Sequence, residues 1–139
     1  MLKQVRRAII PNVQIAVVDH EALTREFIVN VMMYSVNREI LVFESVDGLQ
    51  NFMGQGKSVH MVLSAVHFPG KSGFELLRFL KKEKPQTYFV AMSANPADEI
   101  PATELGADAF LGRPFALKDL FDLVQRFVVE DHACADSSH

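Results

Sequence analysis

The sequence predicts an α/β protein in which a parallel sheet is covered by helices on both faces. Short apolar runs alternate with segments of helical spacing about five times along the chain. The runs are apolar throughout instead of alternating with polar residues, which is typical of strands that are buried on both faces. The predicted strands span residues 13–18, 40–43, 59–64, 87–92 and 107–111.

Three segments that follow predicted strands have apolar residues at helical spacing. Leu23, Phe27 and Val31 follow the first strand, and residues 46–53 form a short helix that is closed by glycines at positions 54 and 56. The last predicted helix has the clearest apolar stripe, made of Leu117, Leu120, Phe121, Val124, Phe127 and Val128.

Residues suited to helix termini support these boundaries. Ser72, followed three residues later by Glu75, fits a capping box. Asn95 is expected to cap a helix that begins with Pro96. Gly106 lies where a glycine is expected to end that helix.

Length and composition favour one cytoplasmic domain. The 139 residues suffice for a single core, and a net charge of −3 gives no reason to expect nucleic-acid binding. Cys134 is the only cysteine, which excludes an internal disulfide, and no apolar run reaches the length of a membrane span. We expect a basic arm over residues 1–12, a folded domain over 13–129 and a flexible tail over 130–139.

Polar residues cluster after four of the predicted strands. The carboxyl ends of parallel strands share one edge of the sheet, where ligands bind in open α/β folds. The side chains expected at this edge are Asp19, His20 and Glu21 after the first strand, Ala65 and His67 after the third, Ser93 at the end of the fourth, and Arg113 after the fifth.

These motifs, in this order, resemble the receiver domain of two-component signalling, the chemotaxis-regulator-like family. The resemblance covers about residues 13–129. It rests on the Asp19-His20-Glu21 segment, the Pro69-Gly70 pair, Ser93-Ala94, Gly106-Ala107-Asp108, Phe110, and Arg113-Pro114-Phe115. It implies a doubly wound, flavodoxin-like sheet of five strands in the order 2-1-3-4-5, and a cis bond before Pro114.

The departures from the family pattern point to a receiver without phosphorylation chemistry. The family's phosphoacceptor aspartate lies four residues before the Pro-Gly pair, and that position is Ala65, whose methyl group cannot attack phosphorus. His20 replaces one metal-binding acid, so magnesium binding is expected to be weak or lost. Arg113 replaces the lysine that contacts phosphoryl oxygens, and Ser93 agrees with the family.

Three other arrangements of this edge are open. Ser64 could act as an unusual acceptor, although neighbouring strand residues point to opposite faces and its hydroxyl is expected to bond locally. Asp19, His20 and His67 could hold a softer metal such as zinc, against the simpler interpretation as surface loop residues. Arg113 could form a salt bridge with Asp19.

The resemblance also implies a surface for protein partners, around the fourth helix, the fifth strand and the last helix. Phe110, Pro114 and Phe115 belong to this switch and output face, and Pro101 predicts that the fourth helix is short or broken. We expect a module that is not an enzyme and that binds a histidine kinase, another receiver, an output domain or a second copy. Phosphotransfer through a non-standard acceptor and a ligand or metal sensor are the alternatives.

Overall fold

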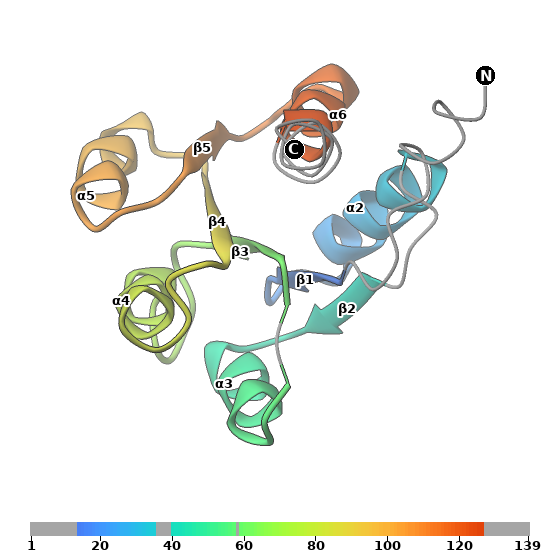
Figure 1. Cartoon of the computed structure of the whole chain (residues 1–139). Helices are drawn as coiled ribbons and strands as arrows, with labels where there is room; N and C mark the ends of the chain where they lie inside the picture. Colours follow the sequence, from blue (N-terminus) through green and yellow to red (C-terminus); the bar gives the residue numbers. More distant parts are fainter. Residues whose placement is uncertain (1–13, 36–39, 58, 127–139) are drawn as a thin grey trace, which may run out of the picture.

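The computed structural model describes residues 14–35, 40–57 and 59–126 and confirms the predicted sheet (Figure 1). Five parallel strands lie in the order β2-β1-β3-β4-β5. The predicted arm and tail lie outside the described residues. The strands are β1 (Ile15–Val18), β2 (Ile40–Phe43), β3 (Met61–Ala65), β4 (Tyr88–Ser93) and β5 (Ala109–Gly112).

Helices cover both faces of this sheet (Figure 1). One face carries α2 (Ala22–Ser35) and α6 (Leu117–Val124). The other carries α3 (Val46–Gly54), α4 (Gly73–Glu83) and α5 (Glu99–Glu104), with a 3₁₀ turn, η1 (Pro96–Asp98), directly before α5. In the described part of the chain, no helix is both long and apolar enough to span a membrane.

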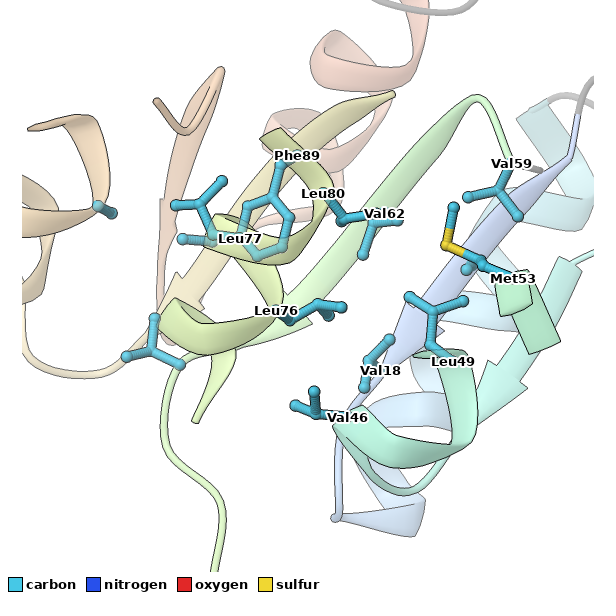
Figure 2. Packing of buried hydrophobic residues seen from close by; sticks show 14 residues of the cluster. Val18, Val46, Leu49, Met53, Val59, Val62, Leu76, Leu77, Leu80 and Phe89 are labelled. Carbon is cyan, nitrogen blue, oxygen red and sulfur yellow. The ribbon is translucent and has the colours of Figure 1, made fainter. Parts of the chain in front are cut away.

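The strands send alternate residues into two separate cores, as a period of two requires. On β1, Ile15 and Val17 pack in the core below α2 and α6, together with Ile28 and Leu120. Ala16 and Val18 point the other way. Figure 2 shows this second core, where strand residues face apolar side chains of α3 and α4, including Val18, Leu49, Met53, Val62, Leu76, Leu77, Leu80 and Phe89.

The predicted starts of four strands were too early. Strand β1 begins two residues later than expected, and β3, β4 and β5 begin one or two residues later and each end one residue later. Residue 59 lies before the ladder, and its carbonyl oxygen accepts a hydrogen bond from Thr87 Oγ1 at 2.9 Å. Apolar content alone does not distinguish a strand residue from a buried residue in the turn before it.

The predicted buried face of α2 was also wrong. Leu23 is 81% exposed and Phe27 is 41% exposed, whereas Ile28 is fully buried. On α6, Leu120 and Val124 are buried as predicted, but Phe121 is 37% exposed. Phe127 and Val128 lie outside the described residues, so the predicted end of that helix stays a prediction.

The helix termini follow the sequence closely. Ser72 Oγ accepts a hydrogen bond from the Glu75 amide, and the Asn95 side chain accepts from the Ala97 amide. Gly106 has a φ of +103°, a left-handed conformation that favours glycine after a helix. As Pro101 predicted, the fourth helix is short: a 3₁₀ turn is followed by a helix of six residues that contains Pro101 in its first turn.

Candidate functional site at the carboxyl edge of the sheet

The carboxyl ends of β1, β3, β4 and β5 bring the predicted residues to one edge. Asp19 follows β1, Ala65 ends β3, Ser93 ends β4 and Arg113 follows β5. The register places Ala65 beside Met92 and the next residue of β4, Ser93, beside Gly112. The prediction that these positions meet is therefore confirmed.

Ala65 closes β3 in a tight environment. Its side chain is 4% exposed, and Gly73 approaches so closely that a Cβ atom there would overlap the Ala65 carbonyl oxygen. The Gly73 amide donates to the Val66 carbonyl oxygen at 2.7 Å. Glycine at position 73 therefore permits the close approach of the start of α4 to the end of β3.

Ser64, the alternative acceptor, is fully buried and bonded locally. Its Oγ donates to the carbonyl oxygen of the next residue, Ala65, at 2.8 Å. This agrees with the prediction that the hydroxyl bonds within its own strand. A nucleophilic role would require the hydroxyl to leave this bond and reach the edge of the sheet.

Asp19 is a fully buried carboxylate whose oxygens are both engaged. Its Oδ1 accepts from the Glu21 amide at 2.9 Å, and its Oδ2 accepts from Arg113 Nη2. Arg25 Nη1 donates to the Asp19 backbone carbonyl oxygen at 2.7 Å. Arg25 is a residue of this site that the sequence did not single out, because the contact depends on the direction of the helix after β1.

Arg113 reaches Asp19 from the opposite side of the site, which confirms the predicted salt bridge. Its Nη1 also lies 3.4 Å from Glu21 Oε1, and its amide donates to the Ser93 carbonyl oxygen at 2.9 Å. The Arg113 side chain is 20% exposed, and its Nε is buried without a hydrogen-bond partner among the described residues. The bond between Arg113 and Pro114 is cis, as the resemblance implied.

A second polar cluster was not predicted and forms around Asp98, the last residue of η1. Asp98 Oδ2 accepts from Ser93 Oγ at 2.5 Å and lies 2.8 Å from His67 Nε2. The Ser93 hydroxyl oxygen also accepts from the Asn95 amide at 3.0 Å. The only signal in the sequence was an acid three residues after a capping Asn95, which sequence spacing alone does not connect to His67.

The three residues proposed for a softer metal do not converge. His67 points to Asp98, while His20 Nδ1 lies 3.9 Å from Asp19 Oδ1 and its ring centroid lies 5.9 Å from that of Phe68. Within residues 14–35, 40–57 and 59–126, no three His, Cys, Asp or Glu side chains lie together as a metal site would require.

The residues predicted for the switch and output face separate into two places. Phe110 is half-buried against the core below α3 and α4. Phe115 packs against the other core, and its ring centroid lies 5.9 Å from that of Phe27 on α2. Beside this pair lies a shallow, mostly apolar hollow of about 420 Å³, lined by Glu21, Leu23, Thr24, Phe27, Ala94, Arg113, Pro114 and Phe115.

A larger hollow of about 590 Å³ lies between the start of α3 and the loop after β3, with His20, Phe43 and Phe68 among its walls. Lys71 at its rim lies 2.8 Å from Asp47 Oδ1, and this hydrogen bond raises the pKa of the Lys71 amine. Neither Ala65 nor Ser93 lines either of the two hollows.

A parallel five-stranded sheet in the order 2-1-3-4-5, with polar side chains at its carboxyl edge, belongs to the flavodoxin-like class of doubly wound folds. The model of the response regulator receiver domain family matches residues 15–125, and the chain belongs to that family. It is a receiver domain of the kind found in two-component response regulators. Such domains are signalling modules that interact with histidine kinases and output domains.

Known proteins agree with this assignment. The chain is 29% identical over 122 residues to the DNA-binding transcriptional regulator NtrC of a Bradyrhizobium species, and the match covers 86% of this chain and 25% of NtrC. The Vibrio cholerae chemotaxis protein CheY4 has the same fold, with a TM-score of 0.74 and 18% identity over 84% of this chain and 98% of CheY4. The receiver domain of NtrX from Brucella abortus gives a TM-score of 0.75 at 23% identity, over 82% and 97% of the two chains.

The residues at the edge do not suit the magnesium ion that phosphorylation in this family implies. Magnesium prefers several free oxygen ligands in octahedral geometry. Asp19 already gives one oxygen to Arg113 and the other to the Glu21 amide. His20 offers nitrogen, and Ala65 offers only a methyl group and its backbone. A cation here would have to displace the guanidinium of Arg113.

Proposed function

We propose that this receiver domain acts through protein contacts without being phosphorylated on an aspartate. The observation that carries the proposal is the pairing of Asp19 with Arg113 beside Ala65. Phosphoryl transfer needs a nucleophile, a metal ion and a free cation for the phosphoryl oxygens. At this edge the methyl group of Ala65 supplies no nucleophile, and the buried carboxylate of Asp19 is paired with the guanidinium of Arg113.

The hydrogen bonds of the other candidates support the same proposal. Ser64 donates its only hydroxyl proton to the Ala65 carbonyl oxygen, and Ser93 donates its own to Asp98. A phosphoryl donor would therefore meet hydroxyl groups that are already bonded within the chain, and Ser64 is bonded only to a backbone carbonyl oxygen, which is no base. We infer a binding module and not an enzyme.

The proposed partner is another signalling protein: a histidine kinase, a second receiver or an output domain, with a homodimer as a further option. We assign this role to the domain over residues 13–129 and place it in the cytoplasm. The chain spans 25% of the length of the NtrC relative, and the proposal concerns the receiver domain alone. Half-exposed Phe27 and the apolar hollow beside Phe115 offer area for such a contact.

Intact-mass spectrometry tests this proposal. The protein is incubated with acetyl phosphate and magnesium, and separately with zinc, beside a receiver that is known to be phosphorylated. We expect the mass of the unmodified chain in both cases. A gain of one phosphoryl group would support a non-standard acceptor and contradict the proposal, whereas zinc retained through native spraying would favour a metal sensor.

A further inference from the structure

We propose that Asp98 is a built-in anion that binds the Ser93 hydroxyl and thereby latches the η1–α5 segment to the end of β4. The inference rests on the proposed function and deepens it, because it says how the segment is held without a phosphoryl group. Asp98 Oδ2 accepts from Ser93 Oγ at 2.5 Å and lies 2.8 Å from His67 Nε2. One oxygen thus joins β4 to the loop after β3.

The Ser93 hydroxyl is fully committed by this contact. A serine hydroxyl has one proton to donate, and Ser93 gives it to Asp98 while its oxygen accepts from the Asn95 amide at 3.0 Å. An external anion could bind Ser93 only by displacing Asp98. The carboxylate therefore occupies, from within the chain, the place that an incoming anion would need.

The contact of Asp98 with Ser93 is more buried than its contact with His67, and is therefore the stronger of the two. Ser93 is 5% exposed and Asp98 is 9% exposed, so the bond between them is a charge-assisted hydrogen bond shielded from water. The His67 side chain is 69% exposed, so its contact with Asp98 competes with solvent and contributes less. The solvent-accessible contact of Asp98 is therefore the one with His67, and the contact with Ser93 holds the segment in place.

The position of α5 depends on the contact between Ser93 and Asp98. Asp98 ends η1 and directly precedes α5, which buries Ala102 and presents Ile100 at 67% exposure. A helix of six residues has little stability of its own and depends on its contacts. Breaking the bond between Ser93 and Asp98 should therefore loosen α5 and the exposed surface around Ile100, while the sheet stays folded.

Amide hydrogen exchange, measured by mass spectrometry on the full chain without any phosphoryl donor, tests the latch. Asp98→Ala and Ser93→Ala should each accelerate exchange in residues 95–106 by about tenfold, since each removes a hydrogen bond to a charged group. His67→Ala should accelerate it by about twofold. The double variant of Ser93 and Asp98 should accelerate exchange by much less than the product of the two single effects, because both variants remove the bond that these residues share.

The matched control is Glu99→Ala, which removes an exposed carboxylate from the neighbouring position of the same segment. Asp98→Asn keeps the shape without the charge, and it serves if Asp98→Ala does not fold. We expect it to accelerate the same amides by about threefold. If exchange in residues 95–106 of Asp98→Ala is within twofold of that in the Glu99 variant, the latch is overturned. Where only Asp98→Asn folds, the same limit applies to that variant. Equal acceleration of exchange in β1 and β3 would also overturn it. Phosphoryl uptake by the parent would contradict the proposed function alone.

Discussion

The guanidinium of Arg113 donates a hydrogen bond to the carboxylate of Asp19 and so joins the residue after β5 to the residue after β1. Two strands, β3 and β4, lie between them in the sheet. The contact therefore crosses the carboxyl edge where Ala65 and Ser93 end their strands. A carboxylate at position 65 would add another acid to the edge that this contact crosses.

Arg113→Ala should lower the free energy of unfolding by about 2–3 kcal/mol, because it leaves the fully buried Asp19 carboxylate without its cation. Because the Arg113 side chain is 20% exposed, the expected loss in the free energy of unfolding is small for the removal of one partner of a buried ion pair. Urea denaturation followed by far-UV circular dichroism measures the change. Lys118→Ala, which removes an exposed ion pair within α6, is the control and should leave the midpoint unchanged.

Asp19→Ala combined with Arg113→Ala should be more stable than the sum of the two single variants predicts. Neither charge is then left without the other, and the coupling free energy is expected at about 1–3 kcal/mol. The same urea titrations, performed on both single variants and the double variant, give this value. Additive effects within about 0.5 kcal/mol would mean that the pair contributes nothing to the folded state.

Gly73→Ala should destabilise the fold by about 2–3 kcal/mol, because its Cβ would overlap the backbone carbonyl oxygen of Ala65. The matched control is Gly70→Ala in the same loop, where a Cβ meets nothing within 4 Å. The control should change the stability by less than about 0.5 kcal/mol. Thermal melts of both variants provide the comparison, and equal losses would show that the loop can move away from Ala65.

Ser64→Ala should lower the free energy of unfolding by about 1 kcal/mol, since it removes one buried neutral hydrogen bond to Ala65. It should not alter the response to acetyl phosphate, because we assign Ser64 no part in phosphoryl transfer. Chemical denaturation gives the first quantity and intact mass gives the second. A phosphoryl group that the parent gains and this variant lacks would identify Ser64 as the acceptor.

Restoring the family's acids should restore the chemistry only when the competing contacts are also removed. Ala65→Asp alone should stay unmodified by acetyl phosphate with magnesium, because His20 and Arg113 still leave the edge without a metal site. Ala65→Asp with His20→Asp and Arg113→Lys should gain one phosphoryl group. Intact mass distinguishes the two, and uptake by the single variant would show that Ala65 is the sole obstacle.

Much of the architecture could be predicted from the sequence because it follows from short-range rules. Apolar runs gave the five strands, and Ser72, Asn95 and Gly106 marked helix ends through their own backbone preferences. The salt bridge between Asp19 and Arg113 could also be predicted, since parallel strands bring the ends of β1 and β5 to one edge. Each of these inferences needs only the order of elements and the chemistry of one or two residues.

The missed features depend on side-chain directions that periodicity does not fix. Leu23 and Phe27 have helical spacing, yet the rotation of α2 on the sheet buries Ile28 in their place. Asp98 meets His67 because a 3₁₀ turn replaces the first part of a helix. His67 therefore does not join His20 and Asp19 in the predicted metal site, because it contacts Asp98 instead.

The most direct test of the central claim is a nuclear magnetic resonance titration of the ¹⁵N-labelled chain with beryllofluoride and magnesium, which together imitate a phosphorylated aspartate. The amides of Ala65, Ser93 and Arg113 report on the carboxyl edge. We predict that their signals stay in place at saturating reagent, because no aspartate is available there to hold the beryllium and Asp19 remains paired with Arg113. A second set of signals for these three residues would contradict the claim and show a working acceptor site.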